Sequence, residues 1–216
     1  DRTPYVCVVL QEVERMNLLT QEIRRSLNEL KLGLEGSLNM SDAMDTLLSS
    51  LKLGRVPATW TKQAYPSLKG LGGWFSDMLL RIEQLGAWEA KLETPVCVWI
   101  SGLFNPMAYV TAVLQATARA KNLPLDQMEV WTDILQQMDP GHYTSYPEDG
   151  MYIHGCCMEG ARWDMKRSVI AESNPKELHP MMPVINVRAV VYGEVDKTGI
   201  FECPTFVTTQ RGGTFT

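Results

Sequence analysis

Apolar residues in the first part of the chain recur at steps of three and four, which is the spacing of one face of an α-helix. Thr3 and Pro4 provide an N-cap and a first-turn residue, and the pattern continues to Leu34, which predicts one long amphipathic helix. Its buried positions are expected to be Val6, Val9, Val13, Met16, Ile23, Leu27, Leu30 and Leu34. A helix with such a long apolar face is expected to pack on neighbouring elements.

Two further helices are expected before residue 94. The first begins after the N-cap Ser41, and its inward-facing residues are Met44, Leu47, Leu48 and Leu51. Residues 55–73 form a connector whose Trp60 and Tyr65 are expected to hold it against a surface. The next helix places four residues on one stripe: Trp74, Met78, Ile82 and Leu85. Residues 1–94 are therefore predicted to form a helical subdomain.

The hydrophobic pattern changes after residue 94. The run VCVWISGL predicts a short strand buried on both faces, and the pair Asn105 and Pro106 predicts a helix over residues 106–121. The later runs MEVWTDIL, MYIHGCCMEG, MPVINVRAVVY and GIFECPTFVTTQ have the composition and alternation of strands. The predicted class is α+β, with the helical layer packed on an antiparallel, barrel-like sheet over residues 95–216 that contains one embedded helix.

Composition narrows the function classes. The chain has 216 residues, 45% of them hydrophobic and 21% charged, and a net charge of -5, which is typical of a globular protein and argues against nucleic acid as a partner. No apolar run is long enough to cross a membrane. Without an initiator Met, the sequence is expected to be a piece of a longer chain. Basic and acidic residues alternate on the first helix, which predicts a solvated, paired face: Glu22, Arg24, Arg25, Glu29 and Lys31.

Common catalytic motifs are absent from the sequence. There is no GxxxxGK[ST], GxGxxG, GxSxG or HExxH, which argues against nucleotide hydrolysis and the common hydrolase chemistries in these residues. The five cysteines are scattered and include no CxxC pair, so a reducing cytosol is expected.

One segment, YIHGCCMEGARWD, contains residue types that carry chemistry. On a strand, His154 and Cys156 would point the same way, with Cα atoms roughly 6.5–7 Å apart, and could supply two zinc ligands. The remaining candidate ligands are isolated in the sequence: His142, His179 and Cys203. A reactive Cys–His pair and a disulfide between Cys156 and Cys157 are further alternatives, but the favoured interpretation is a buried strand with small packing residues.

The end of the same segment, GARWD, has a different character. Arg162 and Asp164 would share one strand face, with Trp163 on the other. An arginine bound to a carboxylate in bidentate fashion, beside a large aromatic anchor, predicts a structural corner or an interface element.

Several long motifs resemble the C-terminal domain of dynein heavy chains. They are WISGLFNPMAYVTAVLQATARAKNLPLD (99–126), PEDGMYIHGCCMEGARWD (147–164) and MPVINVRAV (182–190), and the helical lead-in also fits that pattern in order. The motifs FNP and GARWD resemble the axonemal heavy chains of cilia and flagella, with an outer-arm heavy chain as the best match.

The resemblance implies a domain that lies across one face of a six-module AAA+ ring, with its helices on the ring and its strands in an incomplete barrel. It implies no catalytic, cofactor-binding or metal residues here, because ATP and Mg would bind ring modules elsewhere, and microtubules would be contacted only through the parent motor. The domain would modulate ATP-driven, minus-end-directed motility in the cytoskeleton of the axoneme, with no membrane or nucleic-acid partner. The family usually continues beyond TTQRGGTFT, so the last strand is expected to lack its partner.

Two alternatives of other classes remain open. One is a free-standing Cys/His or zinc protein built around His154, Cys156 and Cys157. The other is a ligand-binding barrel, whose cavity would be lined by Trp131, Tyr152 and Trp163.

Overall fold

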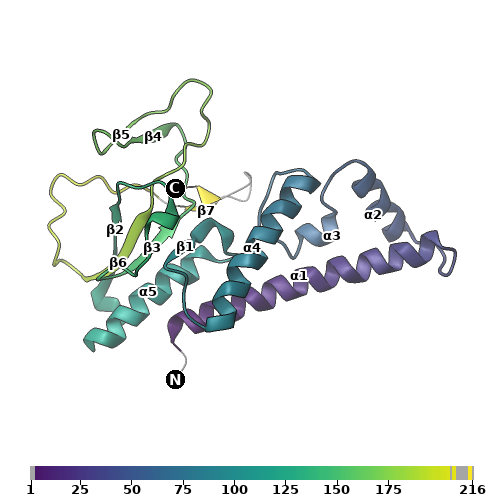
Figure 1. The fold of residues 1–216 in the computed structure, drawn as a ribbon, viewed down its shortest axis with the longest axis horizontal. Helices are drawn as coiled ribbons and strands as arrows, with labels where there is room; N and C mark the ends of the chain where they lie inside the picture. Colours follow the sequence, from purple (N-terminus) through teal and green to yellow (C-terminus); the bar gives the residue numbers. More distant parts are fainter. Residues whose placement is uncertain (1–2, 205, 208–213, 216) are drawn as a thin grey trace.

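Four helices fill the first part of the chain and form an elongated arm. The computed structural model describes residues 3–204, 206–207 and 214–215. The helices of the arm are α1 (Pro4–Leu34), α2 (Asp42–Lys52), α3 (Ala58–Thr61) and α4 (Leu71–Lys91). In Figure 1, α1 runs along one side of the arm and the other three helices lie beside it.

The start of α1 is the predicted one, because the Thr3 hydroxyl accepts a hydrogen bond from the amide of Val6 at 3.3 Å. The buried seam alternates steps of three and four and comprises Val9, Glu12, Met16, Leu19, Ile23, Ser26, Leu30 and Gly33. The prediction was wrong for Leu27 and Leu34, which are exposed. An apolar pattern could not locate this seam, since three of its members are Glu, Ser and Gly.

The connector after α2 is held in place by its aromatic residues, as predicted. Trp60 and Tyr65 are both buried, and the connector includes the short helix α3.

In α4 the expected stripe was wrong at Ile82, which is exposed, because the neighbouring Arg81 is buried in its place. Among the described helices, none combines the length and the apolar character needed to span a bilayer.

A four-stranded sheet adjoins the arm in the order β1-β3-β6-β2. Its strands are β1 (Cys97–Trp99), β2 (Met128–Ile134), β3 (Met151–His154) and β6 (Ile185–Val191). The embedded helix α5 (Pro106–Lys121) is present as predicted and contacts β6 and β2. The expected α+β class is confirmed, and the sheet is not closed into a barrel.

The sheet differs from the prediction in direction and in strand length. β1 runs parallel to β3, so the sheet is mixed and not purely antiparallel. The run VCVWISGL yields a three-residue strand followed by the 3-10 helix η1 (Ile100–Gly102), and only Val98 of this strand is fully buried. Strand length depends on the partner strand, which local alternation does not reveal.

Two antiparallel pairs complete the described strands. β4 (Ala161–Asp164) pairs with β5 (Val169–Glu172), and β7 (Phe206–Val207) pairs with β8 (Thr214–Phe215). The expectation that the last predicted strand lacks a partner was therefore wrong for β7. Two further 3-10 helices are η2 (Leu125–Gln127) and η3 (Pro140–His142).

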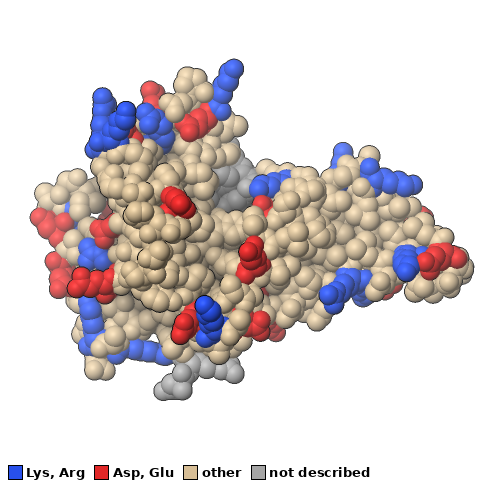
Figure 2. Space-filling view, in the orientation of Figure 1, with Lys and Arg blue, Asp and Glu red and all other residues tan. Residues whose placement is uncertain are grey.

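One hydrophobic cluster runs from α1 through α4 and α5 into the sheet. On the face seen in Figure 2, charged side chains gather at the far tip of the arm and around the β4–β5 hairpin, while the middle carries few of them. The division of the chain at residues 94 and 95 stays a prediction about folding units.

Candidate functional site

The segment YIHGCCMEGARWD does not form one strand. β3 ends at His154, and Gly155 has a positive φ of 92°, so the backbone turns before the cysteines. The prediction that His154 and Cys156 share a strand face was therefore wrong. Burial raises the pKa of the Cys156 thiol to about 12 and lowers the pKa of His154, which disfavours a thiolate–imidazolium pair.

The other candidate ligands are dispersed. The thiol of Cys157 contacts the Met181 sulfur at 3.1 Å, and burial raises the pKa of Cys157. His142 lies in η3 with its ring against Tyr143, while His179 and Cys203 are exposed. Within the described residues, no three His, Cys, Asp or Glu side chains come together as a metal site. The zinc alternative lacks the ligand set that it requires.

Residues Ala161–Asp164 of GARWD form β4, and their charged side chains act on the hairpin itself. Asp164 accepts hydrogen bonds from the amides of Lys166 and Arg167 at 2.9 and 3.3 Å, and these bonds hold the pKa of Asp164 below its usual value. The Arg162 guanidinium donates to the backbone carbonyl of Glu172 at 3.2 Å. The bidentate arginine–carboxylate pair was therefore a wrong prediction, whereas the half-buried Trp163 packs against the core as the expected anchor.

The most connected polar site lies where the arm meets the sheet and was not identified from the sequence. The Glu12 side chain is only 2% exposed, and its carboxylate accepts hydrogen bonds from the amides of Phe104 at 2.5 Å and Asn105 at 2.9 Å. Asn105 is in turn the N-cap of α5 and accepts from the amide of Ala108 at 3.2 Å. A carboxylate of α1 thus fixes the start of α5, where the helix dipole favours negative charge.

Burial and hydrogen bonding act in opposite directions on Glu12. Desolvation raises the pKa of the Glu12 carboxyl above its ordinary value, and the two amide bonds, with Arg15 and Arg81 nearby, partly counter this shift. The net effect is a raised pKa, so the folded state retains a cost for keeping this carboxylate ionised.

Arg81 lies in the same junction, between two aromatic rings. Its guanidinium carbon is 3.6 Å from the ring centre of Tyr65 and 5.2 Å from that of Trp99, and the residue is 5% exposed. Such cation–π contacts compensate part of the cost of burying the charge. Burial lowers the pKa of Arg81, and the nearby carboxylates of Asp77 and Glu12 partly oppose this shift. The hydroxyl of Tyr65 donates to the Trp74 carbonyl at 2.8 Å, which orients the ring beneath Arg81.

Trp99 is positioned by α4 and by two glycines. Gln84 pairs with its backbone as a strand would: the amide of Trp99 donates to Gln84 Oε1 at 2.7 Å, and Gln84 Nε2 donates to the Trp99 carbonyl at 3.2 Å. A Cβ atom at Gly102 or Gly155 would overlap the Trp99 ring, so the glycines of WISG and YIHG are required by this contact.

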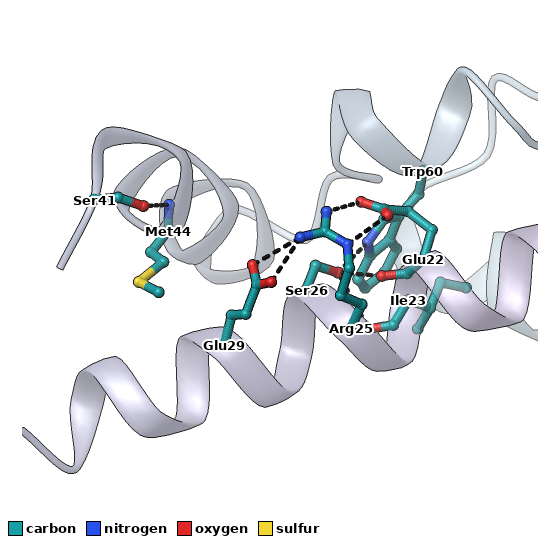
Figure 3. A network of polar contacts seen from close by, with 8 residues as sticks. All are labelled: Glu22, Ile23, Arg25, Ser26, Glu29, Ser41, Met44 and Trp60. Atoms are coloured by element: carbon teal, nitrogen blue, oxygen red, sulfur yellow. Dashed lines mark hydrogen bonds and ion pairs between the residues drawn. The ribbon is translucent and has the colours of Figure 1, made fainter. Parts of the chain in front are cut away.

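A second polar cluster lies along α1, and one of its hydrogen bonds reaches α3. Figure 3 shows the Arg25 guanidinium between two carboxylates, with bonds of 2.8 Å to Glu22 and 2.7 Å to Glu29. This confirms the predicted paired face of the first helix. Beneath it, the indole nitrogen of Trp60 donates to the Ser26 hydroxyl at 2.9 Å, a buried bond that explains a serine in the seam of α1.

A family model for the C-terminal domain of dynein heavy chains matches residues 1–216. The chain belongs to this family. Relatives include the ciliary dynein beta chain of Tripneustes gratilla, which is 48% identical over 215 residues, and the dynein beta chain of the flagellar outer arm of Chlamydomonas reinhardtii, which is 46% identical over 208. Human dynein axonemal heavy chain 9 is 44% identical over 215 residues.

These matches cover 100%, 96% and 100% of this chain, but only 5%, 4% and 5% of the respective relatives. The dynein C-terminal domain described here therefore spans about one-twentieth of their length.

The motifs that resemble dynein heavy chains have structural roles in this domain. In FNP, Phe104 and Asn105 supply the amides bound by Glu12, and Pro106 is the first residue of α5. Phe104 also packs edge-on against Tyr65 with ring centres 6.0 Å apart. This dynein motif thus joins α1 and the connector to the start of α5.

A ligand-binding barrel finds no support in this dynein domain. Trp131 donates to Asp133 at 2.9 Å, and the ring of Tyr152 lies 4.4 Å from that of Tyr143. Two hollows on the described surface lie elsewhere, beside α2 and along the loop at residues 192–197. Trp131, Tyr152 and Trp163, which were expected to surround a cavity, are part of neither hollow.

Proposed function

We propose that these residues are the C-terminal structural and regulatory module of an axonemal dynein heavy chain. The module packs on the AAA+ ring modules of the same heavy chain and modulates ATP-driven, minus-end-directed motility along microtubules. The observation that carries the proposal is the family match over all 216 residues, together with relatives that are named as ciliary, flagellar and axonemal heavy chains.

The proposal assigns no chemistry to these residues. Catalytic, cofactor-binding and metal residues are placed outside this chain, where ATP and Mg bind the ring, and microtubules are contacted only through the parent motor. The module works in the cytoskeleton of the cilium or flagellum, within the axoneme, and has neither nucleic acid nor membrane as a partner. Two relatives named for the flagellar outer arm favour an outer-arm heavy chain.

The junction supports a mechanical role. Arg81 and Gln84 of the arm contact Trp99 of β1, and Glu12 binds the start of α5, so a displacement of the arm is transmitted to the sheet and to α5. A module of this kind can couple movements of the ring modules on which it lies.

Deletion of the module from an otherwise intact heavy chain tests the proposal. Gliding velocity, stall force and basal ATPase are measured on the deleted and intact motors. We expect altered velocity or force with ATPase activity retained. Unchanged velocity, force and ring stability would contradict the proposal. A motor carrying Arg25→Gln is the control, because an exposed ion pair contributes little to structure.

A further inference from the structure

Two serines of the chain directly follow a pair of basic residues and directly precede an aliphatic residue. They are Ser26 in RRSL (24–27) and Ser168 in KRSV (166–169). Serine kinases of the basophilic class recognise such an arrangement, because acidic side chains around their active sites bind the basic side chains of the substrate. The sequence alone does not distinguish the two serines, but the structure does.

Ser26 is inaccessible to a kinase. It lies within α1 and is 7% exposed. Its hydroxyl donates to the carbonyl of Glu22 at 2.8 Å and accepts from the indole nitrogen of Trp60 at 2.9 Å. The preceding Arg25 is bound to the carboxylates of Glu22 and Glu29. Phosphorylation of Ser26 would therefore require α1 to unwind, and it would place a charged group where the helix packs on Trp60.

Ser168 lies in the turn that joins β4 to β5. Lys166, Arg167 and Ser168 are all exposed. The two basic side chains take part in none of the ion pairs found among the described residues. Figure 1 shows this hairpin projecting from the sheet, and Figure 2 shows Lys and Arg side chains around it. The basic pair and the serine are thus presented together on the surface.

Few contacts hold this turn in its folded form. The amide of Ser168 donates to the Asp164 carbonyl at 2.7 Å, and its hydroxyl accepts from Gln136 Nε2 at 2.7 Å. The φ of Ser168 is 54°, in the left-handed region that is unfavourable for a serine. Val169 and Ile170 of β5 are 46% and 41% exposed. A two-stranded hairpin is only marginally stable, so the turn can open into the extended form that a kinase binds, and opening relieves the strain at Ser168.

We propose that Ser168 is a phosphorylation site for a serine kinase that selects basic residues before its acceptor. The Ser168 oxygen forms a bond to the γ-phosphorus of ATP while the bond from this phosphorus to the β,γ-bridging oxygen breaks. The hydroxyl proton passes to the catalytic carboxylate of the kinase, and ADP leaves. The product is a phosphoserine in the β4–β5 turn.

The phosphate has binding partners at this turn. Gln136 already donates to the Ser168 oxygen, and Lys166 and Arg167 supply an ammonium and a guanidinium group from the two preceding positions. The phosphate adds a charge of about -1.5 to -2 at neutral pH. Since Lys166 and Arg167 together outweigh Asp164, phosphorylation changes the net charge of the turn from positive to negative. The modification thus alters the surface that the hairpin presents.

Phosphorylation of the intact heavy chain tests the proposal, with Ser26 as the internal control. The kinase is a purified basophilic domain that, with Mg–ATP, phosphorylates both serines in synthetic peptides of residues 20–32 and 162–174. Phosphate at each serine of the heavy chain is then followed by peptide-resolved mass spectrometry, and each rate is divided by the rate in the corresponding peptide. We expect the value for Ser168 to exceed that for Ser26 by about tenfold or more.

A Ser168 value no higher than that of Ser26 overturns the proposal, because the turn would then be as inaccessible as the interior of α1. If basophilic kinases leave the 162–174 peptide unmodified, the proposal is overturned as well, because the basic pair would then not be recognised.

A pair of variants tests recognition through the basic residues. Lys166→Gln removes a positive charge two positions before Ser168, and Lys176→Gln removes one from an exposed position beyond the end of β5. In the intact heavy chain, we expect Lys166→Gln to lower the rate of phosphorylation at Ser168 by about fivefold or more, and Lys176→Gln to leave it unchanged. Equal rates for the two variants contradict recognition through the basic pair and overturn the proposal.

Discussion

Replacement of Glu12 tests the junction between the arm and the sheet most directly. Glu12→Ala leaves the part-buried amides of Phe104 and Asn105 without their acceptor. Each such group costs about 1–3 kcal/mol, so the free energy of unfolding should fall by about 2–6 kcal/mol. Glu12→Gln keeps one carbonyl oxygen, leaves one amide without an acceptor and no longer buries a charge. Its cost should be about half as large.

Urea denaturation of the purified domain, followed by circular dichroism, measures these costs. The expected order of stability is wild type, then Glu12→Gln, then Glu12→Ala, with an unchanged urea dependence. A Glu12→Ala loss below about 1 kcal/mol, or equal losses for the two variants, would refute the reasoning, because the amides would then have found other partners.

The wild type and Glu12→Gln should also show a characteristic pH dependence. Because burial raises the pKa of Glu12 in the folded state, proton uptake favours folding. This contribution is fully present below the unfolded pKa and is lost as the pH rises through the folded pKa. Glu12→Gln cannot gain it, so the stability gap between the wild type and Glu12→Gln should widen as the pH falls from neutral toward about 4.5. A gap that narrows on acidification would contradict the assignment.

Three further outcomes are expected. Gly155→Ala should lower the free energy of unfolding by about 2–4 kcal/mol in thermal or urea unfolding. The reason is that the φ of 92° at this position disfavours a side chain, and the added Cβ would overlap the ring of Trp99. A loss under about 0.5 kcal/mol would argue against that packing. Trp60→Phe should lower the free energy of unfolding by about 0.5–1.5 kcal/mol for the lost hydrogen bond to Ser26, in addition to the cost of lost packing. A double-mutant cycle with Ser26→Ala should show that the two changes are not additive. The thiol of Cys156, with a pKa of about 12, should react with iodoacetamide at pH 8 about a thousandfold more slowly than in the unfolded protein, and rapid labelling of the native protein would refute its burial.

Helix starts could be predicted because their signals are local. Thr3, Ser41 and Asn105 each accept a hydrogen bond from an amide three residues later, and each lies directly before the first residue of its helix. Strand lengths were less predictable, since β3 ends at His154 through the turn at Gly155 and not through a loss of apolar character. The parallel pairing of β1 and β3 depends on the path of the backbone between them, which no local pattern encodes.

The residues of the junction could not be predicted because their types suggest the surface. Glu12 and Arg81 are charged, and such residues are rarely buried unless they are compensated. The compensating groups for Glu12 are amides 92 and 93 residues further along the sequence, and those for Arg81 are aromatic rings in the connector and in β1. The histidine and cysteines of YIHGCC are the opposite case, because their residue types suggest chemistry whereas their role in the structure is packing.

The reach of Glu12 across the sequence has a consequence for synthesis on the ribosome. At about 5–20 residues per second, Glu12 is made roughly 5–20 s before its partner at Phe104. α1 and α4 are both made before this interval ends, but α5, which packs on α1, is not. The Glu12 carboxylate therefore has neither of its amide partners until Phe104 and Asn105 are made, so the junction can form only after about half of the chain has been synthesised.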